Sequence, residues 1–274
     1  MSNYKIPTLT IAGSDSSGGA GIQADLKTFS AIGTYGMSVI TAITAQNTQG
    51  VFAVEDLNKN IIKKQIEAVF EDIPPRAVKI GMVSSPEIIL EIVKNLKKYN
   101  PKYLVVDPVM ISKSGYYLLK PEAKENLIKY LIPLAYIITP NIPEAEEITG
   151  IKIHNVDDMK RVGKEILQLG PKFVLMKGGH LDGEAVDILI GKNIFKVYKS
   201  ERIDKKNTHG TGCTLSSAIT SYLALGYEIT EAVNFSKIYI TEAIKRSFDI
   251  GHGVGPVHHF YNLNNKKILE VEYV

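Results

Sequence analysis

The chain has 274 residues, of which 45% are hydrophobic, 22% are charged and one is a cysteine. This length and apolar content suffice for one large core or two modest ones. The formal net charge of +3 gives no reason to expect nucleic acid or a membrane surface as a partner, and a single cysteine excludes an internal disulfide.

Neither residues 1–10 nor the longest apolar region suggests export or membrane insertion. Residues 1–10 lack a cationic segment followed by a long apolar one, so we expect no signal peptide. The longest apolar region, residues 127–138, contains Lys129 and Pro133 and is too short to span a bilayer. Together with the lone cysteine, which fits a reducing compartment, these features predict a soluble cytoplasmic protein.

Short apolar runs alternate with amphipathic segments along the chain, and this alternation predicts a mainly parallel sheet covered by helices on both faces. No internal repeat or low-complexity linker interrupts it, so we expect one domain over residues 1–274. The more polar stretch 192–203 predicts a hairpin or an edge strand. Buried strands are expected at residues 9–12, 77–80, 104–106, 136–139 and 173–176, and helices at 22–32, 86–98, 156–169 and 230–247.

Polar clusters follow all five expected strands. In sheets of this kind, ligands bind beyond the carboxyl ends of the strands, so we expect the clusters to converge on one crevice. The clusters are residues 13–15, 81–82, 107–108, 139–141 and 177–179.

The most informative segment is 207–214, in which two glycines, Gly210 and Gly212, precede a helical pattern. Glycines let backbone N–H groups converge at a helix N-terminus, which forms an anion hole. Cys213 stands where this helix should begin, and the same field should lower the pKa of its thiol. Most free cysteines are instead small buried hydrophobes. An anion site beside a possible base is what phosphoryl transfer to an alcohol needs.

A second glycine-rich turn, residues 13–21, follows the first expected strand. It lacks the G-x-G-x-x-G spacing of a dinucleotide site and the Gly-Lys-Ser/Thr ending of a Walker loop. This absence disfavours an NAD-dependent oxidoreductase. We interpret the turn as a place where the backbone approaches a small ligand, rather than as a flexible connection.

Two polar side chains could read a substrate. Asp25 interrupts an apolar helical stripe that includes Ile22 and Phe29, and an inward acid must find a partner. That partner could be a substrate or neighbouring backbone N–H groups, and the residue alone does not decide. Gln46 can donate and accept together, as recognition of a heterocycle edge requires, although a lone glutamine is usually a surface residue.

Three charged residues follow other strands. Asp107 suits Mg²⁺ at a strand end, or it forms a turn. Asn141 and Glu144 have the spacing of a capping box, which the spacing favours, although Glu144 could also organise the water ligands of Mg²⁺. Lys177 could reach a phosphate as a mobile charge, or it is a solvated strand-end lysine.

Taken together, these segments resemble the hydroxymethylpyrimidine and phosphomethylpyrimidine kinases of thiamine biosynthesis, in the ribokinase-like superfamily. The resemblance covers about residues 9–260, and its motifs are specific in combination. They are residues 10–15 with the glycine-rich turn, 45–48, 107–110, 139–144, 176–180, 208–214 and 255–259.

The resemblance implies a three-layer α/β/α fold without the separate lid of related sugar kinases. It implies ATP and Mg²⁺, and often a homodimer. It also implies two successive phosphorylations, of 4-amino-5-hydroxymethyl-2-methylpyrimidine and then of its monophosphate.

Site residues carry over from the resemblance position by position. Cys213 would take the proton of the attacking hydroxyl, and the amides of residues 210–213, with Gly210 and Gly212, would stabilise the transferring phosphoryl group. Asp107 and Glu144 would serve the metal. The pyrimidine pocket would comprise Gly13, Asp25, Gln46, Met82 and Val109, and the ATP and phosphate site would comprise Lys177, Thr208 and Thr211.

Two alternatives stay open at this stage. A pyridoxine or pyridoxal kinase of the same superfamily shares the glycine-rich turn and the glycine–cysteine motif, whereas residues 45–48 and 176–180 favour the pyrimidine. A non-catalytic pyrimidine-binding domain would not need Asp107, Lys177 and Cys213 together. His209 has no assigned role, and for His258 and His259 a structural role is favoured.

Overall fold

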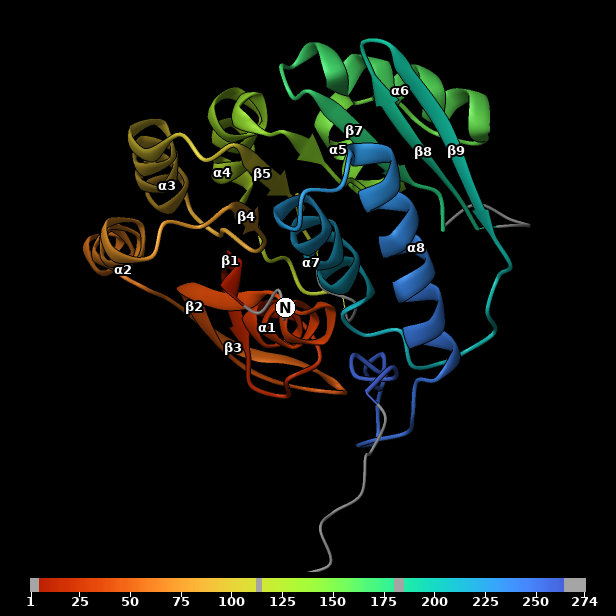
Figure 1. The fold of residues 1–274 in the computed structure, drawn as a ribbon, viewed down its shortest axis with the longest axis horizontal. Coiled ribbons are helices and arrows are strands. Elements are labelled where there is room, and N and C mark those ends of the chain that lie inside the picture. Colours follow the sequence, from red (N-terminus) through yellow and green to blue (C-terminus); the bar gives the residue numbers. More distant parts are fainter. Residues whose placement is uncertain (1–4, 112–114, 180–184, 264–274) are drawn as a thin grey trace, which may run out of the picture.

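The computed structural model describes residues 5–111, 115–179 and 185–263 (Figure 1). Its centre is a nine-stranded sheet with the order β3-β2-β1-β4-β5-β6-β7-β8-β9. The strands are β1 (Pro7–Asp15), β2 (Tyr35–Asn47), β3 (Gly50–Asp56), β4 (Ala77–Ile80), β5 (Tyr103–Val106), β6 (Ile137–Ile138), β7 (Phe173–Lys177), β8 (Ala185–Gly191) and β9 (Ile194–Ser200).

The middle of the sheet is parallel and both edges are antiparallel. Strands β2, β1, β4, β5, β6 and β7 run in the same direction. Strand β3 pairs antiparallel with β2 at one edge, and β8 and β9 pair antiparallel beyond β7 at the other. The prediction of a mainly parallel sheet is therefore confirmed, and so is an edge strand within residues 192–203.

Helices cover both faces of this sheet (Figure 1). One face packs against α2, α3, α4, α5 and α6, and the other against α1, α7 and α8. This three-layer α/β/α arrangement confirms the predicted fold class. The helices are α1 (Gly21–Ile32), α2 (Lys59–Asp72), α3 (Pro86–Tyr99), α4 (Pro121–Asn126), α5 (Ile142–Thr149), α6 (Val156–Gln168), α7 (Thr211–Ala224) and α8 (Ile229–Lys245).

Strand β5 shows why the two faces form. Leu104 and Val106 belong to the cluster under α2–α6, whereas Val105 belongs to the cluster under α7 and α8. Side chains alternate between the faces of a strand, so a short run of apolar residues supplies two cores at once. All three side chains are at most 2% exposed.

Helix ends follow local sequence signals. Ser85 accepts a hydrogen bond from the Ile88 amide at the start of α3, Pro86 is its first residue, and Asn100 ends it with a φ of 45°. Pro at the first position and a left-handed residue after the last one are common helix boundaries. Helix α7 begins at Thr211, two residues before the predicted start at Cys213. Among the described residues, none of the helices has the length and apolar character needed to cross a bilayer.

The parallel strands place their carboxyl ends at one edge of the sheet. Asp15, Asn47, Ile80, Val106 and Lys177 end β1, β2, β4, β5 and β7 there. The predicted polar clusters that follow these strands therefore meet at this edge, where the loops can form a ligand site.

Candidate active site

A cavity of about 750 Å³ lies at the carboxyl edge of the sheet. This volume is within the range of small-molecule sites. Twelve of the thirteen predicted site residues line it, the exception being Asp25. Those on the wall are Gly13, Gln46, Met82, Asp107, Val109, Glu144, Lys177, Thr208, Gly210, Thr211, Gly212 and Cys213.

A lysine between two carboxylates marks one part of the cavity. Lys177 Nζ lies 3.0 Å from Asp107 Oδ1 and 3.9 Å from Glu144 Oε2. The hydroxyl of Thr139 also donates to Asp107 Oδ1, at 3.0 Å. Burial acts to raise the pKa of the Asp107 carboxyl, but the charges of Lys177 and Lys79 outweigh it, and the pKa lies below its usual value. Asp107 is therefore ionised at neutral pH.

Glu144 has the first of the roles considered from its spacing, and its role toward Mg²⁺ stays a prediction. Its backbone N–H donates to Asn141 Oδ1 at 2.9 Å, and its Oε2 accepts from the Asn141 amide at 2.8 Å, so the capping box is confirmed. The same carboxylate lines the cavity. Burial, together with the charge of Asp107, raises the pKa of Glu144 to about 7, against the opposing effect of Lys177.

The two carboxylates fit Mg²⁺ that arrives with a nucleotide. Within residues 5–111, 115–179 and 185–263, no group of three or more His, Cys, Asp and Glu side chains is placed to hold a metal ion. Mg²⁺ commonly takes only one or two protein carboxylates and completes its shell with phosphate oxygens and water. A cation near Asp107 and Glu144 would also relieve the mutual repulsion that helps to raise the pKa of Glu144.

The N-terminus of α7 faces the same ion pair. Gly210 has a φ of 79°, and a Cβ on it would lie 1.8 Å from the carbonyl oxygen of Gly19, so only glycine fits. A Cβ on Gly212 would lie 3.5 Å from both Asp107 Oδ2 and Lys177 Nζ. Backbone amides of the first helical turn and the Lys177 ammonium thus border one space, which suits an anion.

Cys213 is where the pattern placed it, but its predicted acidity is wrong. Burial raises the pKa of the Cys213 thiol to about 11, and the nearby positive charge of Lys79 only partly opposes this effect. The field at a helix N-terminus favours the thiolate, but the cost of placing a thiolate in a buried position is larger here. Cys213 is a neutral thiol in the unliganded protein.

Asp25 stands behind the cavity wall. Its side chain is fully buried and forms an ion pair with Lys79, with Nζ–oxygen distances of 2.9 and 3.0 Å. The hydroxyls of Thr10 and Ser217 each donate to it at 2.6 Å. These partners are side chains rather than backbone N–H groups, and Asp25 does not line the cavity, so its contact with the pyrimidine stays a prediction. Lys79 does reach the cavity wall, and a lysine inside the buried run 77–80 was the signal for it.

Apolar side chains also contribute to this cavity. Met82 and Val109 line it, and a Cβ on Gly13 would lie 2.9 Å from Met82 Sδ, so the first glycine of the turn admits the methionine. Gln46 extends from the end of β2 toward His209, with their Nε2 atoms 3.3 Å apart. Apolar side chains and the Gln46 amide thus line one cavity.

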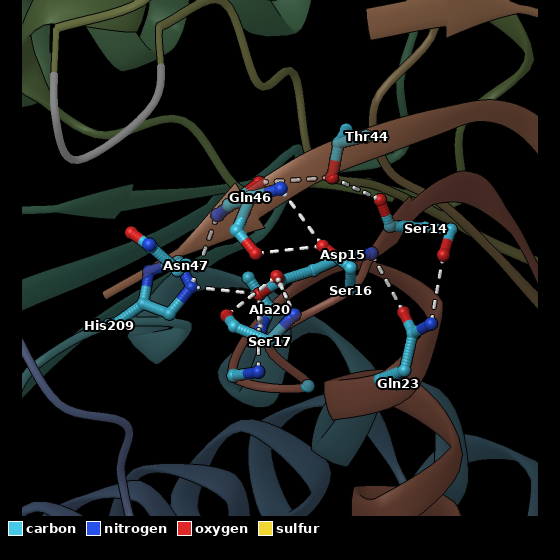
Figure 2. Close-up of polar contacts among 12 residues, drawn as sticks. Ser14, Asp15, Ser16, Ser17, Ala20, Gln23, Thr44, Gln46, Asn47 and His209 are labelled. Carbon is cyan, nitrogen blue, oxygen red and sulfur yellow. Dashed lines mark hydrogen bonds and ion pairs between the residues drawn. The ribbon is translucent and has the colours of Figure 1, made fainter. Parts of the chain in front are cut away.

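Asp15 and His209 were missed by the sequence interpretation as a pair. Asp15 Oδ2 lies 2.8 Å from His209 Nε2, and the carboxylate also accepts from Ser17, Gly19 and Ala20 (Figure 2). Burial acts to raise the pKa of Asp15, but these hydrogen bonds outweigh it and lower the pKa to about 2. An aspartate before a Ser-Ser-Gly-Gly turn is a usual acceptor for turn amides, and that was the available signal.

The remaining histidines of the motifs, His258 and His259, differ in their contacts. His259 is 4% exposed and its Nε2 lies 3.1 Å from Thr214 Oγ1, and burial lowers the pKa of its ring to about 3. His258 donates its backbone N–H to Ala243 and packs edge-on against Phe248. Neither lines the cavity. His180, part of a motif in the sequence, lies outside the described residues.

Comparison with known proteins gives the family. A family model described as phosphomethylpyrimidine kinase matches residues 15–258. A hydroxymethylpyrimidine/phosphomethylpyrimidine kinase of Rhizobium meliloti (strain 1021) is 52% identical over 257 residues, which are 92% of this chain and 96% of that protein. The thiamine biosynthesis bifunctional protein ThiED of Geobacter sulfurreducens is 50% identical, and the match spans 92% of this chain and about half (51%) of that protein.

Solved structures agree. A phosphomethylpyrimidine kinase from Clostridium difficile 630 is 93% identical, with a TM-score of 0.80 over 88% of this chain and 100% of that chain. The pyridoxal kinase of Staphylococcus aureus in complex with AMP-PCP and pyridoxal is 38% identical, with a TM-score of 0.85 over 93% of each chain. The fold is that of a ribokinase-like small-molecule kinase. The chain belongs to the phosphomethylpyrimidine kinase family.

Proposed function

We propose that this kinase phosphorylates the hydroxymethyl group of 4-amino-5-hydroxymethyl-2-methylpyrimidine and then converts the monophosphate to the diphosphate, for thiamine biosynthesis. The observation that carries the proposal is the shared cavity of about 750 Å³. Lys177, Asp107 and the N-terminus of α7 lie together on its wall, and Gln46, Met82 and Val109 line the same cavity. A phosphate site and a site for a polar heterocycle are therefore joined.

The phosphate end acts through position and charge. Phosphoryl transfer needs alignment and neutralisation of the equatorial oxygens more than covalent chemistry. We assign Lys177 and the first-turn amides, which include Gly210 and Gly212, to the transferring group, and Thr208 and Thr211 to the ATP phosphates. Lys177 is held by Asp107 at 3.0 Å and is only 14% exposed, which limits its freedom and strengthens its field.

We assign Asp107 and Glu144 to Mg²⁺ bound with ATP. When bound there, the metal would neutralise phosphate charge and help to orient the nucleotide. The protein's own contribution is to hold Asp107 ionised and to keep Glu144 within 3.9 Å of Lys177.

We assign the acceptance of the hydroxyl proton to the thiolate form of Cys213, which exists only after the thiol has released its own proton to solvent. With a pKa of about 11, the thiol is protonated at neutral pH and cannot act as a base in the resting protein. In a loose transition state the attacking hydroxyl keeps its proton until late, so alignment supplies most of the acceleration. Only the small thiolate fraction of Cys213 can then take this proton, so the residue contributes less than alignment does.

At the substrate end, Gly13, Met82 and Val109 form the ring site and Gln46 its polar edge. A glutamine amide both donates and accepts, so it can pair with an amino group and the adjacent ring nitrogen. Pyridoxal offers a ring of similar size without the exocyclic amino group. The likeness to the pyridoxal kinase of Staphylococcus aureus supports pyridoxal as a second, weaker substrate.

The first test is a Mg-ATP assay of the purified protein with hydroxymethylpyrimidine, its monophosphate and pyridoxal in parallel, with each product followed by mass. Diphosphate formed from both pyrimidines is the expected result. Turnover of pyridoxal alone would contradict the thiamine role and leave the kinase chemistry intact. Tight pyrimidine binding without turnover of ATP would favour the non-catalytic alternative.

We further propose a homodimer and a cytoplasmic location for the protein. Light scattering after gel filtration tests the first, because a dimer has twice the 30.2 kDa mass of the chain. A monomer at micromolar concentration would contradict it. Cell fractionation with a cytoplasmic marker tests the second.

A further inference from the structure

His209 meets two partners through one ring nitrogen. Its Nε2 lies 2.8 Å from Asp15 Oδ2 and 3.3 Å from the amide nitrogen of Gln46 (Figure 2). The side chain of Asp15 is 3% exposed and that of His209 is 12% exposed. Water therefore has little access to this contact, so each donor needs an acceptor within it.

The Asp15 carboxylate decides where the His209 proton lies. Its two oxygens already accept from Ser17, Gly19 and Ala20, and an ionised carboxylate can only accept. The fifth contact, at 2.8 Å, is thus a hydrogen bond donated by His209 Nε2. A ring nitrogen that carries a proton has no lone pair left for another donor.

It follows that the atom of Gln46 facing His209 must be the oxygen. An N–H group of Gln46 directed at a protonated Nε2 would oppose two donors at 3.3 Å. The oxygen and nitrogen of an amide occupy nearly the same volume, so turning the group by 180° keeps the packing. Oε1 then accepts a share of the His209 N–H bond.

Thr44 gives the same answer independently. Its hydroxyl donates to the carbonyl oxygen of Ser14 at 2.8 Å, and a hydroxyl has a single proton. The amide atom of Gln46 at 3.4 Å from Thr44 Oγ1 must then be a donor. Both neighbours of the amide therefore select the orientation with Nε2 toward Thr44 and Oε1 toward His209.

We propose that Asp15 and His209 are positioning residues that lock the Gln46 amide in this orientation and thereby select an aminopyrimidine over pyridoxal. The proposal rests on the function proposed above. The locked amide offers one N–H and one lone pair in a set order. That order matches a ring nitrogen beside an amino group, and pyridoxal has no such amino group.

The surroundings hold the Asp15–His209–Gln46 chain of hydrogen bonds, here called the relay, rigidly. A Cβ on Gly19 would lie 2.4 Å from His209 Cδ2, so the glycine-rich turn closes against the imidazole. The His209 amide donates to the carbonyl of Gly255 at 3.1 Å. The hydroxyl of Ser16 donates to the backbone carbonyl of Gln46 at 2.7 Å and accepts from the backbone N–H of Gln46 at 2.9 Å. The backbones at both ends of the relay are fixed, so only the terminal amide needs orienting.

The test compares His209→Ala, His209→Gln and the wild type on hydroxymethylpyrimidine and pyridoxal. Loss of one oriented hydrogen bond predicts that His209→Ala raises the KM for hydroxymethylpyrimidine about tenfold, with kcat within about threefold. The KM for pyridoxal should change less than about threefold. His209→Gln keeps an N–H donor for Asp15 and should recover most of the lost affinity, as should added imidazole with His209→Ala. His154→Ala, at an exposed histidine between α5 and α6 that does not line the cavity, is the matched control.

Equal KM increases for both substrates, or a loss of kcat alone, would overturn the selectivity role. An independent readout is the nuclear Overhauser spectrum of the Gln46 side-chain amide, which we expect to show contacts with Thr44. Contacts from these amide protons to the His209 ring instead would overturn the orientation. This spectrum needs no turnover, so it tests the inference even if the proposed function is wrong. A wild type that is inactive on the pyrimidine would reveal failure of the proposed function.

Discussion

Among the lysine–aspartate pairs at this site, Lys79–Asp25 and Lys177–Asp107 differ in what else they can bind. Lys79 and Asp25 are both 0% exposed, and Thr10 and Ser217 complete the hydrogen bonds of the carboxylate. Lys177 is 14% exposed at the cavity wall, and its distance to Glu144 is 3.9 Å. The Lys79–Asp25 pair, which we call the closed pair, is saturated and supports the wall. The Lys177–Asp107 pair, which we call the open pair, has capacity left for a ligand. Strand-end position alone does not separate the two cases.

The closed pair should fail in stability rather than in binding. Asp25→Asn leaves Lys79 charged in a buried place, which predicts a loss of about 3–5 kcal/mol in the free energy of unfolding. Denaturant unfolding measures it. The folded fraction should keep its KM for hydroxymethylpyrimidine.

A double variant provides the control for this prediction. Asp25→Leu combined with Lys79→Met removes both charges and should recover much of the lost stability. A KM increase with unchanged stability in Asp25→Asn would instead support the predicted role of Asp25 as a substrate contact.

The open pair should fail in turnover. Lys177→Gln removes the mobile charge that we assign to the transferring phosphoryl group, and we expect kcat to fall about 100- to 1,000-fold. Steady-state kinetics measure the fall. Lys160→Gln removes a surface lysine of an exposed ion pair and is the matched control, with activity unchanged. Full activity in Lys177→Gln would show that neither pair contributes to turnover, which would contradict the difference between the two pairs.

Cys213 lies within the field of both pairs, since Lys79 lowers its pKa while Asp25 and Asp107 raise it. We expect Cys213→Ala to keep pyrimidine affinity and to lose about 100-fold in kcat, at the lower end for a group that handles a proton. Rates measured from pH 6 to pH 9 distinguish the mechanisms. A nearly flat profile supports transfer dominated by alignment, whereas a tenfold rise per pH unit would require the thiolate as the base.

The smallest expected effect concerns another closed contact, that of His259 with Thr214 in α7. Burial lowers the pKa of His259 to about 3 from an ordinary value near 6.5. Between these values the unfolded chain binds the proton and the folded protein does not, so stability is lost as the pH falls below about 6.5. From pH 7 to pH 5 the loss is about 2 kcal/mol.

The comparison for this effect is His259→Gln, which cannot titrate and should lack that part of the pH dependence. Unfolding midpoints at pH 5 and pH 7 for the two proteins provide the measurement. Parallel pH dependence in both would contradict the assignment to His259.

Sequence alone determined the elements with strong periodic or capping signals. The predicted strands at residues 77–80 and 173–176 agree with β4 and β7 to within one residue, and the capping box of Asn141 and Glu144 is present. The hairpin strand β3 and the helix α2 were not predicted, because a half-exposed edge and a mixed polar helix carry weaker patterns. The order of strands at the edge of a sheet also depends on contacts distant in sequence.

For the site, sequence determined which residues face one cavity, because parallel strands bring the loops after them to one edge. Only the tertiary structure decided the chemical state of those residues. Burial raised the pKa of Cys213, against the prediction. Lys79, 54 positions away from Asp25, forms the ion pair that the sequence left open. Desolvation and pairing depend on what surrounds a group in three dimensions, and neighbours in sequence do not report it.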